Sequence, residues 1–363
     1  MKKASKNILA LFIGCVIAWL ILEVFLRWAQ PIPQRIKGDQ IILPHNRLYQ
    51  FDNPGYPGLD SLIVHRKNAL GFRGPALPDD WEQSLTMIAV GGSTTECMLL
   101  SEDKDWPSLL SDALHDQYPH IWINNAGLDG HSTFGHQILL SDYIIPLQPD
   151  YVLFLLGAND VGRTDLNQFD AEKLRDQLPF WKRLLYQSEV VNLALNLKRA
   201  AQAQDLGLDH QYLDLEASAL RATDSLAIQQ IIAAEQVMID RYQVRVFALI
   251  DSCRVNEIEP ILMTQPTLLG EGVDPITGID LVRVAWQDAN GEAYWRRLEA
   301  YNEALREAAE EKNVLLIDLA HLLPKRSDYF YDPIHYTNTG SEAISKIIAQ
   351  KLAANLASQA ASP

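Results

Sequence analysis

Five short apolar runs, each followed by a polar or glycine-rich turn, constrain the fold of this chain more than any other feature. They are Thr86–Val90, Ile121–Asn125, Tyr151–Leu156, Glu259–Thr264 and Val314–Asp318. Runs of this length suit strands that are buried on both faces. Apolar spacing near 3.6 residues predicts helices at about 105–117, 294–312 and 340–356. Strands that alternate with helices predict an α/β fold with a parallel sheet of about five strands and helices on both faces.

The alternation stops between about residues 163 and 258. This stretch is mainly helical in pattern, for example from Ala217 to Asp251. We predict an insertion at about 163–258. It could form a lid or one wall of a substrate pocket, or it could be a structural decoration.

The region before the first predicted strand is rich in turn-forming proline and glycine. We interpret residues 29–85 as a juxtamembrane arm that packs on the main domain at 86–358. Arg73 in this arm could contact a substrate, although a structural salt bridge is the simpler interpretation.

The first 28 residues predict a membrane anchor, one N-terminal transmembrane helix at 1–28. Three lysines precede an apolar run from Ile8 to Leu22, which Val24–Leu26 extend past Glu23. Its length is close to the ~20 residues that a bilayer core requires. No small residues follow at signal-peptidase spacing, so we expect an uncleaved helix. The three lysines before it favour a cytoplasmic N-terminus, with the rest of the chain outside the cytoplasm, although Arg27, Arg35 and Lys37 follow it. A processed lipoprotein would turn polar after Cys15, whereas this chain stays apolar.

Charge argues against nucleic acid as a partner. Residues 1–40 carry a net charge of +4 and the whole chain carries −15, so residues 41–363 carry −19. Such a domain repels phosphate backbones, and the sequence contains no basic patch interleaved with aromatic residues. Cys97 and Cys253 could be bridged in an oxidising compartment, or they could be two separate buried thiols.

A glycine-rich turn after the first predicted strand offers a hydroxyl nucleophile. In Gly91-Gly92-Ser93-Thr94, the glycines permit a tight turn, and a helix that starts there would direct amide dipoles towards a developing anion. The same residues could form a turn in which Ser93 only caps a helix. Phosphate binding is another alternative, but the lysine of a phosphate-binding loop and the dinucleotide-binding glycine pattern are both missing.

Two further turns offer donors for an oxyanion. Gly130 ends a glycine-rich segment at 125–130, and Asn159 follows the clearest predicted strand. The Gly130 N–H and the Asn159 side-chain amide could meet an oxyanion together with the Ser93 amide. Taken alone, each segment is also compatible with an ordinary strand-exit turn.

A candidate base lies near the C-terminus. Asp332 and His335 are three residues apart, so the carboxylate can accept from Nδ1–H and leave Nε2 to take a serine proton. An ordinary surface turn and a metal-binding Asp/His pair are alternatives, although a two-metal site would need an acidic ligand where Gly92 stands. His131 and His136 are competing bases, which we expect to line the pocket instead.

These blocks resemble those of the SGNH hydrolases, the GDSL-like esterase/lipase superfamily. The serine, glycine, asparagine and histidine of that family are matched here by Ser93, Gly130, Asn159 and His335, with Asp332 completing the D-x-x-H motif. The resemblance implies a flavodoxin-like three-layer α/β/α fold (the SGNH hydrolase fold), no metal and no cofactor. It also implies a substrate that bears an ester or acyl group, on a small molecule, a lipid or a glycan.

The prediction that results is a membrane-anchored serine esterase with the triad Ser93, His335 and Asp332. Gly92 departs from the family, which has aspartate before the nucleophile, and this leaves open which group supports the turn. One alternative is an O-acyltransferase that moves an acetyl group to or from a cell-envelope glycan through the same acyl-serine intermediate. Another is a catalytically silent, membrane-anchored binding module.

Overall fold

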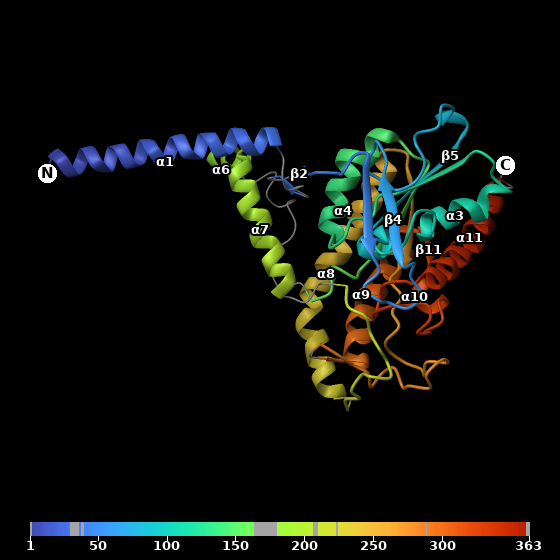
Figure 1. The fold of residues 1–363 in the computed structure, drawn as a ribbon. Coiled ribbons are helices and arrows are strands. Elements are labelled where there is room, and N and C mark those ends of the chain that lie inside the picture. Colours follow the sequence, from blue (N-terminus) through green and yellow to red (C-terminus); the bar gives the residue numbers. More distant parts are fainter. Residues whose placement is uncertain are drawn as a thin grey trace. The chain divides into compact units, whose positions relative to one another are not determined.

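A computed structural model describes residues 2–29, 36–37, 40–162, 180–205, 210–222, 224–287 and 289–360 (Figure 1). The chain divides into two compact units, residues 1–44 with 171–209 and residues 45–170 with 210–363. The boundaries that we expect between anchor, arm, main domain and insertion stay predictions. The start of the insertion, residues 163–179, lies outside the described residues.

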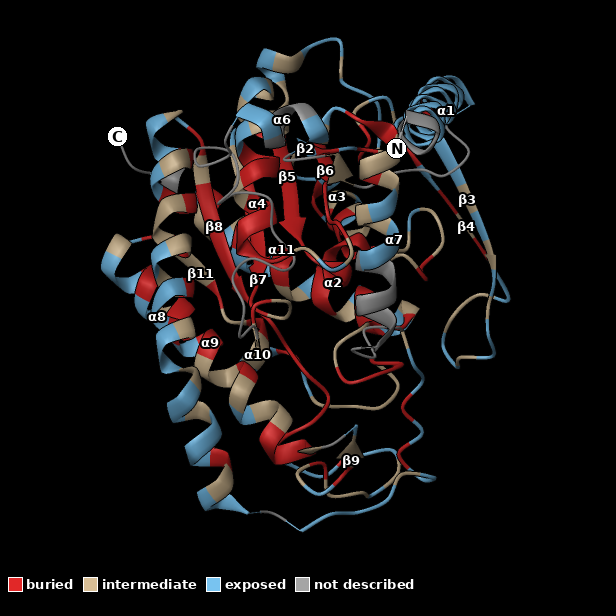
Figure 2. Ribbon diagram, turned by 90° about the vertical axis from the view of Figure 1, so that its left-hand side faces the viewer, coloured by how far each residue is buried: buried red, intermediate tan, exposed pale blue. Residues whose placement is uncertain are grey.

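The larger unit is built on a five-stranded parallel sheet, as the alternating pattern predicts. Its strands are β5 (Leu85–Gly91), β6 (Ile121–Asn125), β7 (Tyr151–Leu156), β8 (Glu259–Thr264) and β11 (Leu315–Ile317). Their spatial order is β6-β5-β7-β8-β11, which is the flavodoxin-like order. The second strand in sequence lies on one side of the first, and the remaining three follow on its other side. Most strand residues are buried, because helices cover both faces (Figure 2).

Two groups of helices cover the sheet. On one side α3 packs against α11, and on the other α8 packs against α4 and α9 (Figure 1). These helices are α3 (Trp106–His115), α4 (Thr133–Leu139), α8 (Ser225–Val255), α9 (Gly291–Lys312) and α11 (Asn338–Ala360). The prediction of a helix from Ala217 is wrong at its start. Asp224 accepts a hydrogen bond from the Ala227 amide (3.0 Å) and caps α8 there.

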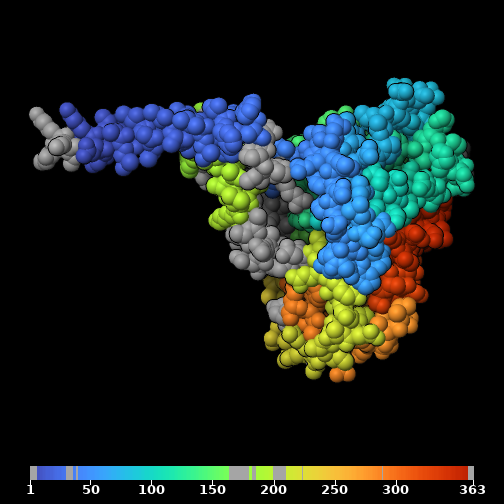
Figure 3. Space-filling view, viewed as in Figure 1, coloured from blue at the N-terminus to red at the C-terminus, as the bar shows by residue number. Residues whose placement is uncertain are grey.

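Shorter elements connect the larger ones. They are β3 (Arg47–Asp52), β4 (Leu62–Lys67), η1 (Trp81–Gln83), α2 (Ser93–Glu96), η2 (Leu140–Ile144), η3 (Ile145–Leu147), β9 (Ala285–Trp286), β10 (Ala289–Asn290) and α10 (Leu319–Leu322). β3 and β4 form an antiparallel hairpin. Near it, Arg73 exchanges two backbone hydrogen bonds with Asn125 at the end of β6 (2.9 and 2.8 Å). On the surface, the hairpin region lies beside the segment that starts at residue 210 (Figure 3), where the Tyr56 hydroxyl donates to the His210 carbonyl (2.7 Å).

The smaller unit joins the N-terminal helix to two helices from the middle of the chain. Its described elements are α1 (Lys2–Ala29), β1 (Ile36–Lys37), β2 (Gln40–Ile41), α6 (Phe180–Tyr186) and α7 (Glu189–Asp205). Within α1, Lys6–Ala29 is long and apolar enough to cross a membrane, as an anchor or as a signal sequence.

Glu23 interrupts the apolar run of α1 because it caps another helix. Its carboxylate accepts from Ser188 Oγ (2.8 Å), from the Glu189 amide (2.9 Å) and from the Val190 amide (3.2 Å). These groups form the amino-terminal end of α7, where orphan N–H groups attract negative charge. Arg27 donates to the same carboxylate (2.8 Å). The charge in the apolar helix therefore has a structural partner.

The described cysteines of the larger unit are separate thiols. Cys97 and Cys253 are both buried and unbridged. Burial raises the pKa of each thiol, that of Cys253 to about 12. Of the two possibilities that the sequence leaves open, the structure has the separate buried thiols.

Candidate active site

The residues expected to carry chemistry follow strands of the parallel sheet. Ser93 begins α2 directly after β5, and Asn159 follows β7. The loop that leads to Gly130 follows β6 and stays near the serine turn, because the Leu128 amide donates to the Gly91 carbonyl (3.1 Å). Ligands of open parallel sheets bind at these carboxyl ends of the strands.

Ser93, His335 and Asp332 form one hydrogen-bonded chain. His335 Nε2 lies 2.7 Å from Ser93 Oγ, and Nδ1 lies 2.5 Å from Asp332 Oδ2. The other oxygen of Asp332 accepts from the Ile334 and His335 amides (2.9 and 2.7 Å). Burial opposes ionisation, but the charge and hydrogen bonds of His335 hold the pKa of Asp332 below its usual value. An ionised carboxylate on Nδ1 leaves Nε2 to accept the serine proton.

Asn159 lies directly against the serine turn. Its Nδ2 donates to the His131 carbonyl (3.0 Å), and a Cβ at position 92 would collide with that Nδ2. Glycine at 92, where the family has aspartate, is therefore what permits this close approach. Gly130 adopts a φ of +75°, a conformation that favours glycine. The ring at hydrogen-bonding distance from Ser93 Oγ is that of His335, whereas the His131 ring packs over Gly135 and His136 is buried in α4.

Arg73 supports the backbone that follows the serine turn. Its guanidinium is buried and donates to four backbone carbonyls that follow Ser93 in the sequence, at 2.8–3.1 Å. Those carbonyls belong to Glu96, Cys97, Leu100 and Ser101. The same side chain lies 3.4 Å from the buried carboxylate of Asp105. The prediction that Arg73 forms a structural salt bridge is confirmed. Arg73 is also the group that supports the turn here, where residue 92 is glycine.

A second buried ion pair lies beside the first. Lys67 Nζ is 3.3 Å from Glu96 Oε1, and both side chains are less than one-tenth exposed. The other oxygen of Glu96 accepts from the Asp129 amide (2.5 Å). Glu96 therefore ties the end of α2 to the loop that carries Gly130. In the sequence, Lys67 and Glu96 look like ordinary solvent-exposed residues, so no pattern predicted that they form a buried ion pair.

Asp160, next to Asn159, also has a structural role. It is buried and accepts from the Thr133 hydroxyl (2.6 Å) and the Thr133 amide (3.2 Å) at the start of α4. Arg245 of α8 lies 3.1 Å from the same carboxylate and stacks over the Phe134 ring (3.8 Å). A helix from the predicted insertion thus helps to hold the loop that presents Asn159.

His210 is the most prominent site residue that the sequence did not reveal. Its ring packs on the His335 ring with 4.2 Å between centroids. Ligand atoms of His210, Asp332 and His335 lie within 4.8 Å of one another, a spacing that could hold a metal ion. Asp332 and His335 already bond to each other, however, and His335 also faces Ser93. A hydrogen-bonded acid–base group therefore describes these residues better than a ligand set.

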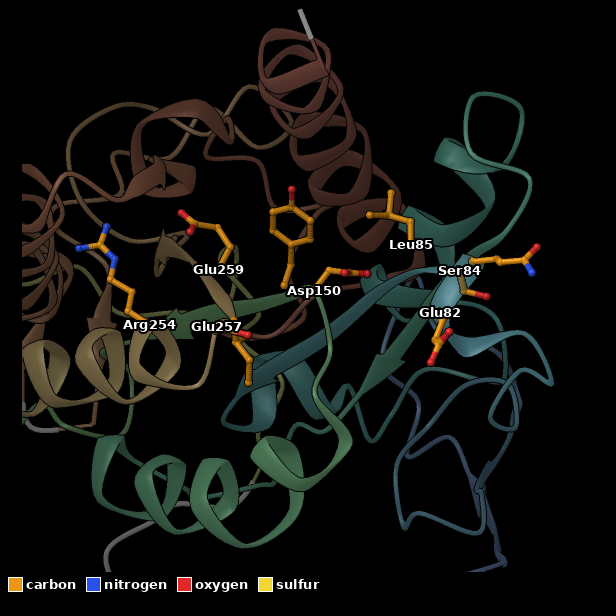
Figure 4. Close-up of a pocket in the computed structure, with 10 residues that line it drawn as sticks. Glu82, Ser84, Leu85, Asp150, Arg254, Glu257 and Glu259 are labelled. Atoms are coloured by element: carbon orange, nitrogen blue, oxygen red, sulfur yellow. The ribbon is translucent and has the colours of Figure 1, made fainter. Parts of the chain in front are cut away.

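A hollow of about 600 Å³ lies at the other end of the sheet (Figure 4). Glu82, Asp150, Glu257 and Glu259 line it with Arg254, near the amino ends of β5, β7 and β8. The carboxylate of Asp150 is engaged by the amide and hydroxyl of Thr86 (2.7 and 2.8 Å). This hollow is remote from the Ser93 chain of hydrogen bonds.

A flavodoxin-like sheet with a hydrogen-bonded serine, histidine and aspartate at the carboxyl ends of its strands has the architecture of the SGNH-type hydrolases. The model of the GDSL-like Lipase/Acylhydrolase family matches residues 89–343. The chain belongs to this family.

Individual relatives are more distant. An arylesterase from Vibrio mimicus is 32% identical over 79 residues, which are 22% of this chain and 40% of that protein. The match thus spans about two fifths of the curated relative. An acetylxylan esterase from Geobacillus stearothermophilus is 17% identical, with a TM-score of 0.42 over 73% of this chain and 93% of its own. A putative lipolytic protein of the G-D-S-L family from Desulfitobacterium hafniense is 14% identical, with a TM-score of 0.41 over 74% and 99%.

Proposed function

We propose that this protein is a serine esterase that cleaves carboxylic esters through an acyl-serine intermediate. The observation that carries the proposal is the continuous chain from Ser93 Oγ to His335 Nε2 (2.7 Å) and from His335 Nδ1 to Asp332 (2.5 Å). Membership of a lipase/acylhydrolase family supports the same chemistry.

The reaction has two halves. Ser93 Oγ attacks the ester carbonyl carbon while His335 Nε2 takes the serine proton, and the tetrahedral intermediate then expels the alcohol, which receives that proton. Water next attacks the acyl-serine, His335 takes a proton from it, and the acid leaves as the proton returns to Ser93 Oγ. Asp332 stays ionised throughout and stabilises the imidazolium.

The oxyanion is held by the Ser93 and Gly130 amides and by the Asn159 side chain. The contact of Asn159 with Gly92 and the hydrogen bond that ties the Gly130 loop to β5 support this assignment. Each such donor is worth about 10²–10³ in kcat.

We further propose that α1 is an uncleaved membrane anchor and that the catalytic unit lies outside the cytoplasm. The 24-residue apolar segment Lys6–Ala29 and the lysines before it support this orientation. The substrate is an ester-bearing small molecule, lipid or glycan.

Labelling of the full chain by a fluorophosphonate probe tests the proposal without knowledge of the substrate. Wild type is expected to be labelled at Ser93 and to hydrolyse a short-chain aryl ester. Ser93→Ala and His335→Ala should abolish turnover, whereas the exposed Ser141→Ala serves as a matched control with full activity. Turnover that persists in Ser93→Ala would overturn the proposal.

Two alternatives give different results in the same assays. An O-acyltransferase would be labelled too, but with a polysaccharide acceptor present it would yield acylated glycan in place of free acid. A silent binding module would remain unlabelled.

A further inference from the structure

His210 is built into the catalytic group although it lies far from it in sequence. Its ring covers one side of the His335 ring, with centroids 4.2 Å apart and planes tilted by 38°. Only 11% of the His210 side chain is exposed.

Neighbouring groups fix the position of this ring. His210 Nδ1 lies 2.6 Å from the Tyr331 hydroxyl, and the Tyr331 ring is itself nearly parallel to that of His335 (8°, 5.5 Å). The His210 carbonyl accepts from the Tyr56 hydroxyl (2.7 Å). Three residues later, the Leu213 amide donates to the Tyr331 carbonyl (2.8 Å). The contact with His335 is therefore held from several sides.

The second ring nitrogen of His210 faces the loop of the proposed oxyanion hole. His210 Nε2 lies 3.8 Å from Asp129 Oδ1, and Asp129 directly precedes Gly130. His210 thus lies between the proposed base and the loop that carries a proposed oxyanion donor.

Three acidic residues from different elements act on the charge of the His210 ring. Asp129 belongs to the loop after β6, Glu96 to α2 and Asp332 to the loop before α11, where His335 also lies. Burial favours the neutral ring, but Asp129, followed by Asp332 and Glu96, raises the pKa of His210 above its usual value.

On the basis of the proposed esterase function, we propose that His210 is a positioning residue for His335 whose own protonation switches off proton transfer from Ser93. A neutral His210 ring packs against His335 and holds it towards Ser93 Oγ. A protonated His210 repels the proton that His335 must accept in the transition state, and the distance of 4.2 Å is short enough for this repulsion to act inside a buried site. Asp129 offsets only part of it, because its nearest oxygen lies 3.8 Å away on the other side of the ring.

A low pH should therefore inhibit the enzyme, because activity is lost as the pH falls through the pKa of His210. Since this pKa is raised, the loss of activity begins at a higher pH than it would with an ordinary histidine. The acid limb of the pH profile of kcat/KM therefore contains the ionisation of His210.

The test is a pH profile of kcat/KM for an aryl ester between pH 5 and 9, measured on the full chain. His210→Gln keeps a polar partner for Tyr331 but cannot become charged. Its acid limb should move to lower pH and lose one ionisation, which raises the ratio of activity at pH 6 to that at pH 8 by about threefold to tenfold. His210→Ala also removes the ring support, so kcat/KM at pH 8 should fall about tenfold as well.

Controls separate this role from a structural one. The pH 6 to pH 8 ratio cancels the folded fraction of a variant wherever that fraction is equal at the two pH values, which circular dichroism at pH 6 and pH 8 checks. His115→Gln, an exposed histidine on α3, should have the profile of wild type. Profiles of His210→Gln and wild type that superimpose would overturn the inference while Ser93→Ala remains inactive. Activity in Ser93→Ala would instead overturn the esterase proposal itself.

Discussion

Arg73→Met tests whether one buried guanidinium supports the nucleophile turn. Methionine is close to arginine in volume, but its side chain ends near the position of the arginine Nε and offers no donor and no charge. The substitution leaves four backbone carbonyls without their donor and leaves the buried Asp105 without its cation.

The loss can be worked out from these contacts. Removing one partner of a buried ion pair costs about 3–5 kcal/mol. Each carbonyl adds up to about 1 kcal/mol, less wherever water replaces the donor. Asp105 keeps Asn125 Nδ2 (2.7 Å) and the Ser108 hydroxyl (2.7 Å), which lowers the cost of its unpaired charge. We expect a loss of about 4–5 kcal/mol from a total free energy of unfolding of roughly 5–15 kcal/mol.

Urea unfolding of the full chain in detergent, followed by tryptophan fluorescence, measures this loss. Trp106 is fully buried and its indole donates to the Thr94 carbonyl (3.2 Å), so it is one of the chain's eight tryptophans whose surroundings change when the larger unit unfolds. Arg47→Met, at an exposed position of β3, is the matched control and should cost less than about 0.5 kcal/mol. Asp105→Asn in the Arg73→Met background should recover part of the loss. A change below about 1 kcal/mol in Arg73→Met would refute the reasoning.

Three further outcomes are expected. Gly92→Ala should lower kcat by about 100-fold or more by displacing the Asn159 amide, whereas Gly14→Ala, where a Cβ meets nothing within 4 Å, should leave kcat unchanged. Glu23→Ala should destabilise the start of α7 by about 1–2 kcal/mol, seen as faster amide exchange after Gln187; unchanged exchange would contradict this. Burial lowers the pKa of His65 to about 4, so wild type should lose up to about 3 kcal/mol between pH 6.5 and 4, as the unfolded chain binds the proton first. His65→Phe should lack this slope, and an identical slope would count against it.

The sheet could be predicted because each of its strands is a short, mainly apolar run in the sequence. All five predicted runs became strands, within a residue or two at each end, because residues buried on both faces must be apolar. Ser93 and Asn159 could be proposed as site residues because parallel strands end on one edge of the sheet, which restricts where a site can form. The prediction of helix from Ala217 failed for a tertiary reason. Arg221 and Ala285 donate backbone hydrogen bonds across to Arg283 and Ala219 (both 2.8 Å), and this pairing competes with helix formation.

The contacts around the site could not be predicted because they depend on long returns of the chain. The His210 ring packs on His335, 125 positions later, and its Nδ1 lies beside the hydroxyl of Tyr331, 121 positions later. The local sequence around residue 210 contains no pattern that predicts either contact. Lysine and glutamate are residue types that usually lie on the surface, so the sequence gives no sign that Lys67 and Glu96 are buried. Only their burial, below one-tenth exposure each, shows that they belong to the interior.

The need for these distant partners arises from the length of α2. A helix of four residues can satisfy few of its own carbonyls, and Cys97 ends it at once with a φ of +50°. The carbonyls of Thr94 and Thr95 accept from the Trp106 indole and the Asn125 side-chain amide, and those of Glu96 and Cys97 accept from Arg73. Arg73 precedes β5 in the sequence, so a chain that began at β5 would keep Ser93 but lose the side chain that holds the backbone after it.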